Sequence, residues 1–207
     1  MGLKLRRKKS AVIPPLAGGT YMAVCIGIVD LGEQYNDNYK NYQSKLLLMF
    51  EIPTETVTVE GEEKPRWVSR EYTASLSGKA ALSKHLVGWR SKEFTEDELS
   101  EDGSGFDITT MLGKPCMLSI TVKEGKNGSY NKIENIAAIP KGIPAPTTDA
   151  ELLAFDIDDR DEDVFSKLPE WIQTKIKKST QYSDNPPEDN VDFESGDQSG
   201  DEEECPI

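Results

Sequence analysis

Histidine is nearly absent from this chain of 207 residues, which contains only His85. Metal sites with two histidine ligands are therefore excluded, and we interpret His85 as a surface residue of a helix. Cysteine is scarce as well, because Cys25, Cys116 and Cys205 are widely spaced, odd in number and match no disulfide framework or metal motif. We expect no metal and no cofactor, and a reducing, cytoplasmic compartment.

Long apolar runs are also lacking. The longest, Leu46–Phe50, is far too short to span a membrane. Residues 1–19 begin with a basic stretch, but Pro14 and Pro15 interrupt the apolar part, which makes it a poor signal peptide. We therefore expect no membrane association and interpret residues 1–19 as a flexible basic arm.

Motifs that would carry catalysis are incomplete. Ser77-Gly78-Lys79 resembles the end of a phosphate-binding loop, but Thr73 stands where that motif needs its first glycine. Asp156–Asp161 resembles the start of a calcium loop, but it lacks the glycine at position six and the glutamate at position twelve. No nucleophile with a neighbouring base is evident, so we predict no catalytic residue and a protein that is not an enzyme.

Acidic residues are unevenly distributed along the chain. The net charge of −13 would argue against nucleic acid, but residues 1–148 carry 19 Lys/Arg and 18 Asp/Glu. Residues 149–163 carry eight acids and one base, and residues 183–207 carry ten acids and no base. The acidity therefore belongs to the C-terminal third, and the N-terminal body is free to bind an anion.

Hydrophobic periodicity predicts a small β domain at residues 20–140. A helix at residues 77–89 interrupts a series of strands, and Gly27 lies in the first strand where a bulge would fit. The predicted strands are Thr20–Asp30, Gln43–Ile52, Trp67–Ser75, Cys116–Lys123 and Ser129–Ile139. This order predicts a mostly β fold, a five-stranded OB-like Greek-key barrel with one helix between strands three and four. Another small α+β domain with the same element order is the alternative.

Beyond Pro140 the composition changes. Residues 141–163 are rich in proline and then in acids, which is typical of a linker. Residues 164–179 place Leu168, Trp171, Ile172 and Ile176 on one face of a short amphipathic helix. Residues 180–207 are predicted to be a disordered acidic tail.

Basic and aromatic residues alternate where an OB-fold binds nucleic acid, on strands two and three and on the loops joining strands one–two and four–five. The candidate residues are Tyr35, Tyr39, Lys40, Tyr42, Lys45, Arg66, Trp67, Arg70, Tyr72, Lys123, Lys126, Tyr130 and Lys132. Packing is the usual role of an aromatic residue in a strand, and for Trp67 core and stacking roles are equally compatible with the sequence. Alternation puts Arg66, Arg70 and Tyr72 on the face opposite Trp67, and only one of these faces can line a groove.

The last residues form an acidic run followed by an apolar tip. They are Asp201, Glu202, Glu203, Glu204, Cys205, Pro206 and Ile207. This arrangement resembles the tail tip of bacterial single-stranded DNA-binding proteins, although Cys205 and Ile207 stand where that family prefers Ile and Phe. The body, especially Gly78-Lys79 and residues 112–116, is similar to replication-module proteins of phages that infect Gram-positive bacteria.

The resemblance implies a phage-type single-stranded DNA-binding protein that acts in replication or recombination in the cytoplasm of a bacterial host cell. It also implies that the tail recruits replication or recombination proteins. Two alternatives stay open: a protein-interaction adaptor that does not itself bind DNA, and a DNA mimic. The sequence is compatible with a homo-oligomer and does not separate DNA from RNA.

Overall fold

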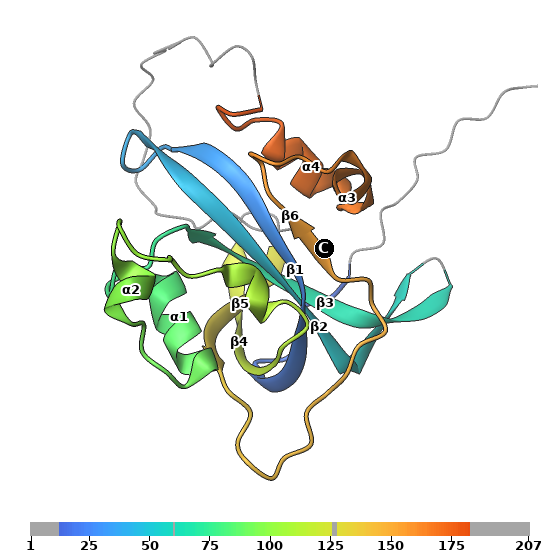
Figure 1. The fold of residues 1–207 in the computed structure, drawn as a ribbon. Coiled ribbons are helices and arrows are strands. Elements are labelled where there is room, and N and C mark those ends of the chain that lie inside the picture. The colour runs from blue at the N-terminus through green and yellow to red at the C-terminus, as the bar shows by residue number, and fades with distance from the viewer. Residues whose placement is uncertain (1–12, 60, 126–127, 183–207) are drawn as a thin grey trace, which may run out of the picture.

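The computed structural model describes residues 13–59, 61–125 and 128–182. The fold is mostly β, as predicted: five antiparallel strands form one strongly curled sheet, a half-barrel with the order β3-β2-β1-β4-β5 (Figure 1). The strands are β1 (Gly19–Asn36), β2 (Asn41–Val59), β3 (Glu62–Thr73), β4 (Pro115–Gly125) and β5 (Gly128–Ala137). β1 and β2 are longer than predicted, because the polar stretch after residue 30 continues them as a hairpin.

Two register shifts bend β1, one between Cys25 and Gly27 and one between Asp30 and Gly32. The first confirms the predicted bulge at Gly27. At Gly32 the backbone has φ +71°, and an added Cβ would lie 2.6 Å from the side chain of Ile157. Only glycine fits such a position. β1 can therefore pair with β4 through its first half and with β2 through its second half.

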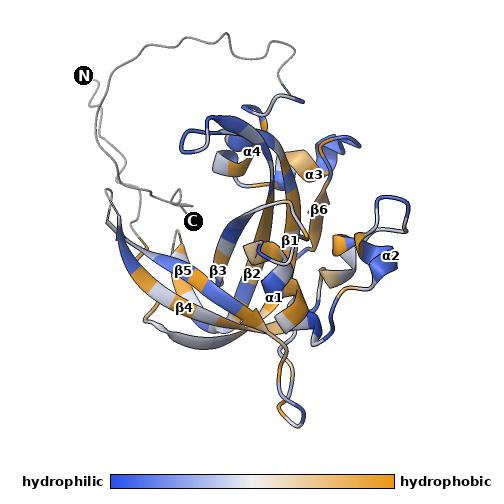
Figure 2. Cartoon of the chain, turned by 90° about the vertical axis from the view of Figure 1, so that its left-hand side faces the viewer, coloured by the Kyte–Doolittle hydropathy of each residue, from blue (hydrophilic) through white to orange (hydrophobic). Residues whose placement is uncertain are grey.

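The inner face of the sheet surrounds the first hydrophobic core, and α1 (Ala81–Arg90) closes one end of it (Figure 2). Leu82, Leu86 and Trp89 of α1 pack against inward side chains such as Phe50. The helix predicted at residues 77–89 is confirmed, but it begins at Ala81 because Ser77–Ala80 forms a turn. The short helices α2 (Glu96–Leu99) and η1 (Ile108–Met111) connect α1 to β4.

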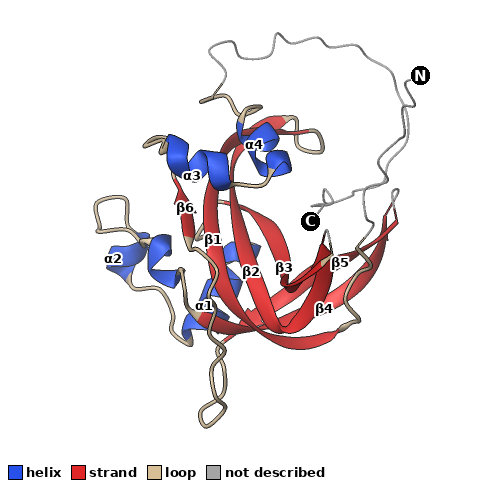
Figure 3. Cartoon of the chain, turned by 90° about the vertical axis from the view of Figure 1, so that its right-hand side faces the viewer, coloured by secondary structure: helices blue, strands red, loops and turns tan. Residues whose placement is uncertain are grey.

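The outer face of β1 and β2 is covered by a second layer, which we call the C-terminal layer (residues 148–182). It contains β6 (Leu153–Phe155), which pairs in parallel with β1, and the helices α3 (Glu162–Lys167) and α4 (Glu170–Ile176) (Figure 3). A second hydrophobic core lies between this layer and the sheet. It contains Ile26, Val29, Leu31, Leu47, Met49, Leu153, Phe155, Ile157, Phe165, Leu168, Ile172 and Ile176.

This layer corrects the expected linker and separate helix. Residues 141–163 are only partly a linker, since Leu153, Phe155 and Ile157 alternate inward and are buried. The acids beside and between them, Glu151, Asp156 and Asp158, are exposed to solvent, and they give the segment the composition of a linker. The predicted helix at 164–179 is present as two short helices, because Pro169 separates α3 from α4. No helix in the described part of the chain is long and apolar enough to cross a membrane.

Candidate nucleic-acid interface

The hairpin joining β1 to β2 carries three exposed tyrosines. Tyr35 and Tyr42 are cross-strand partners whose rings meet edge to face, with centroids 5.3 Å apart. Tyr39 lies at the tip and is 73 % exposed. The Asn36 side chain accepts hydrogen bonds from the backbone N–H groups of residues 38 and 39, and Lys40 adopts a left-handed φ of 51°. The turn is therefore built locally, and it holds aromatic faces in solvent.

Two predicted lysines accompany this hairpin. Lys40 is exposed at the tip beside Tyr39. Lys45 donates hydrogen bonds to Gln43 (3.1 Å) and to Thr73 (3.2 Å), which ties the base of the hairpin to the end of β3. Lys40 is thus available to a phosphate, whereas Lys45 already has polar partners.

The β4–β5 hairpin brings together three more predicted residues. Tyr130 and Lys132 of β5 are the cross-strand partners of Lys123 and Thr121 of β4. The Glu134 carboxylate lies 3.5 Å from Lys123 and 4.0 Å from Lys132. These ion pairs are partly exposed to solvent and long, so they are weak and an incoming phosphate can compete with them. Lys126 lies outside the described residues.

On β3 the predicted residues divide between the two faces, and the structure decides their roles. Arg66, Arg70 and Tyr72 point inward, and Tyr72 is only 3 % exposed within the first core. Arg66 is also buried, and burial lowers its pKa. Arg70 donates a hydrogen bond to the backbone carbonyl of Ile133 and so links the edge strands β3 and β5. These three residues therefore lie on the inner face of the half-barrel and not on its exposed outer surface, and Arg70 and Tyr72 make contacts that hold the half-barrel together.

The opposite face of β3 is also occupied. Trp67 is half-buried at the edge of the second core, and its indole N–H donates to the Glu51 carboxylate (3.0 Å). Glu71 forms an ion pair with Lys175 of α4. Trp67 is thus a packing residue, and the C-terminal layer occupies much of the outer surface of β2 and β3.

His85 is buried rather than on the surface, which corrects the sequence interpretation. Its Nδ1 accepts a hydrogen bond from the Tyr72 hydroxyl (2.8 Å), and its Nε2–H donates to the Glu134 carbonyl (3.0 Å). The Glu134 carbonyl can only accept, so the proton of the neutral imidazole lies on Nε2 and Nδ1 is free to accept from Tyr72. Burial, with a contribution from the positive charge of Arg70, lowers the pKa of His85 to about 4. His85 therefore connects α1 to β3 and β5.

This arrangement predicts a loss of stability in acid. Between about pH 6.5 and pH 4 the unfolded chain binds a proton at His85 and the folded chain does not. As the pH falls across that range, the free energy of unfolding should therefore decrease by up to about 3 kcal/mol. Above about pH 6.5, His85 should contribute no pH dependence. Because the chain has one histidine, NMR of its imidazole protons measures the pKa directly. A midpoint near 6.5 in the folded protein would contradict the network.

The predicted partner-binding tip, Asp201–Ile207, lies outside the described residues, as does the predicted basic arm up to residue 12. Among the residues that the structure does describe, no three His, Cys, Asp or Glu side chains gather as a metal site.

The structure thus leaves two hairpins as the exposed part of the predicted surface. They rise on either side of β3, which lies between β2 and β5 in both side views (Figures 2 and 3). One hairpin offers tyrosine rings and Lys40, and the other offers Lys123, Tyr130 and Lys132. The chain matches no protein-family model, and no curated protein matches its sequence. The functional argument therefore depends on these side chains.

Proposed function

We propose that this protein binds single-stranded DNA, with the strand lying across the β1–β2 and β4–β5 hairpins. The observation that carries the proposal is the set of solvent-held rings of Tyr35, Tyr39 and Tyr42. Exposed aromatic rings beside lysines are what a single strand needs, because bases stack on the rings and cations neutralise the phosphates.

The topology supports this function. A curled sheet in the order β3-β2-β1-β4-β5, with a helix after the third strand that closes one end, agrees with an OB-fold. The loops joining strands one–two and four–five are the usual binding loops of that fold. Here the C-terminal layer covers much of the face that would otherwise lie between them. We therefore place the strand on the hairpins and expect little base specificity.

The covered face also favours a second candidate, an adaptor that binds other proteins of a phage replication or recombination module and no DNA. In both cases the acidic tail is proposed to recruit partner proteins. The two candidates differ in one measurable property, the affinity for a bare single strand.

Titration of fluorescent oligo-dT with the full chain tests the proposal. With three lysines at phosphates, Lys40, Lys123 and Lys132, the affinity should fall about 20-fold between 50 and 200 mM salt, because each released counterion adds to the salt dependence. A duplex of the same length should bind much more weakly, since its bases are not free to stack. Absence of binding at both salt concentrations would exclude the proposal and leave the adaptor.

A further inference from the structure

A groove of about 600 Å³ lies away from the two hairpins, between the end of α1, the start of β4 and the loop that follows β5. Its floor is apolar and includes Trp89, Met111 and Ile143, the last of which is 46 % exposed. Arg90, Lys92, Lys114 and Lys141 line its walls, and no acidic side chain is among the described residues that line it.

Contacts to backbone groups join the elements around this groove. The Trp89 indole N–H donates to the Pro115 carbonyl (2.9 Å), and the Ala138 N–H donates to the Gly88 carbonyl (3.1 Å). A Cβ at Gly88 would lie 2.8 Å from the Ile136 carbonyl oxygen, so only glycine allows α1 to lie this close to β5. The walls therefore belong to firmly joined elements.

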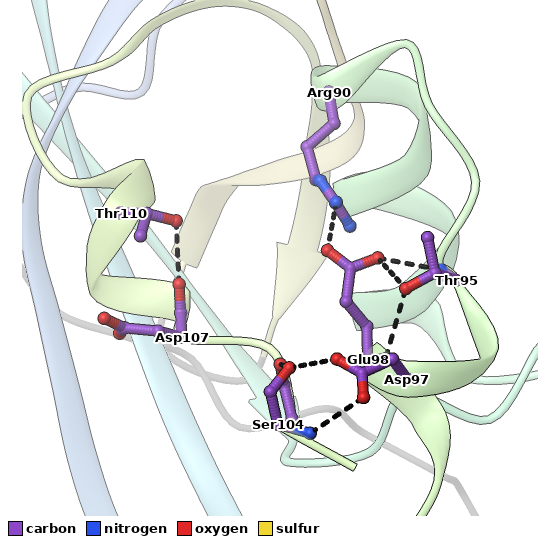
Figure 4. Close-up of polar contacts among 8 residues, drawn as sticks. Arg90, Thr95, Asp97, Glu98, Ser104, Asp107 and Thr110 are labelled. Carbon is purple, nitrogen blue, oxygen red and sulfur yellow. Dashed lines mark hydrogen bonds and ion pairs between the residues drawn. The ribbon is translucent and has the colours of Figure 1, made fainter.

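Arg90 is held in place at one side of the groove. Its guanidinium lies over the rings of Phe94 and Phe106, 4.6 and 4.4 Å from their centroids. Figure 4 shows the pair that its Nη2 forms with Glu98 at 2.5 Å. Its Nη1 is buried and has no hydrogen-bond partner among the described residues.

Three of the four cations make no direct ion pair, although the charge of Lys92, like that of Arg90, contributes to the lowered pKa of Glu98. Lys92, Lys114 and Lys141 are exposed, and none of them forms an ion pair with another residue in the part of the chain that the structure describes. A ligand for this groove should therefore carry several negative charges next to a small apolar group.

We propose that the groove binds residues 201–207 of the same chain. Asp201–Glu204 would face the three lysines, and Cys205, Pro206 and Ile207 would lie on the apolar floor. A nucleic-acid strand fits less well, because Trp89 is only 4 % exposed and offers no free ring on which a base could stack.

The length of the chain permits this docking. Residues 183–200 can span about 60 Å when extended. A compact body of this size is only about 40 Å across. Tethering gives the tip an effective concentration of about a millimolar, so weak contacts suffice. Because the lysines are exposed, added salt should release the tip. While docked, the tip is withheld from other proteins, which makes the groove a regulator of partner binding.

A nitroxide on Cys205 of the full chain tests the proposal by NMR. Labelling is selective because Cys25 and Cys116 are buried, and burial raises the pKa of both thiols, that of Cys25 to about 12. Amide signals at residues 89–92, 111–114, 138–139 and 141–143 should broaden at low salt and recover at 0.5 M NaCl. Broadening at other residues alone, or none, overturns the proposal. Broadening that disappears on dilution overturns docking within one chain.

Charge reversal provides the control. Lys92→Glu with Lys141→Glu should abolish the broadening at the groove. Lys79→Glu with Lys84→Glu changes the charge equally on exposed residues that do not line the groove and should leave the broadening intact. If both pairs of substitutions had the same effect, the attraction between the tip and the body would be non-specific. That result would contradict binding of the tip in the groove. Neither pair tests DNA binding, so this proposal can fail or succeed independently of the proposed function.

Discussion

A chain that ends at residue 147 is expected to lose its folded structure, whereas a chain that ends at Tyr182 keeps it. Removal of the C-terminal layer uncovers a group of buried apolar side chains on the outer face of the sheet. These are Ile26, Val29, Leu31, Leu47 and Met49. At about 2 kcal/mol each, their burial contributes about 10 kcal/mol, which is comparable with the whole stability of a typical domain.

Thermal unfolding followed by circular dichroism, together with size-exclusion chromatography, measures this effect. A cooperative transition and a monodisperse peak for the chain ending at residue 147 would show that the layer is dispensable. In the full chain, Ile172→Ala should lower the free energy of unfolding by about 2–5 kcal/mol, since Ile172 is fully buried. Thr174→Ala, on the exposed side of the same helix, should change it little.

Combined replacement of Tyr35, Tyr39 and Tyr42 by alanine is expected to weaken oligo-dT binding at least 30-fold. This estimate takes two stacked bases at a minimum of about 1 kcal/mol each. The corresponding triple phenylalanine variant keeps the rings and should bind nearly as well as the unmodified protein. Fluorescence anisotropy at fixed salt measures both. Unchanged affinity in the alanine variant would remove the β1–β2 hairpin from the interface.

Tyr72 provides the contrasting control. Tyr72 lies on β3, beside the second strand of this hairpin, but its side chain points into the first core. Its hydroxyl donates a hydrogen bond to His85. Tyr72→Phe should therefore lower stability by about 1 kcal/mol, the typical worth of a hydrogen bond, and leave DNA affinity unchanged. A large loss of affinity without loss of stability would place Tyr72 in the interface after all.

The order of the elements could be predicted from the sequence because it depends on local patterns. Alternation in strands, the change of period at residues 77–89 and the glycine at position 27 are visible in the sequence alone, although the helix begins only at Ala81. The exposure of Tyr35, Tyr39 and Tyr42 was also predictable, because their neighbours are too polar to be buried with them. Three tyrosines in a polar loop are a local signal.

Only the tertiary structure decided which face of β3 points inward and what covers the other. Alternation places Tyr72 and Trp67 on opposite faces of β3, but it does not tell which face is buried in the barrel. The curl of the sheet decides this, because it encloses the face that carries Tyr72. The burial of Leu153 and Phe155 likewise could not be predicted from the acidic composition of residues 149–163. Two apolar residues are buried only where another apolar surface covers them. That surface is the outer side of β1 and β2, more than a hundred residues earlier in the chain. Burial is a property of two surfaces in contact, and a single segment contains only one of them.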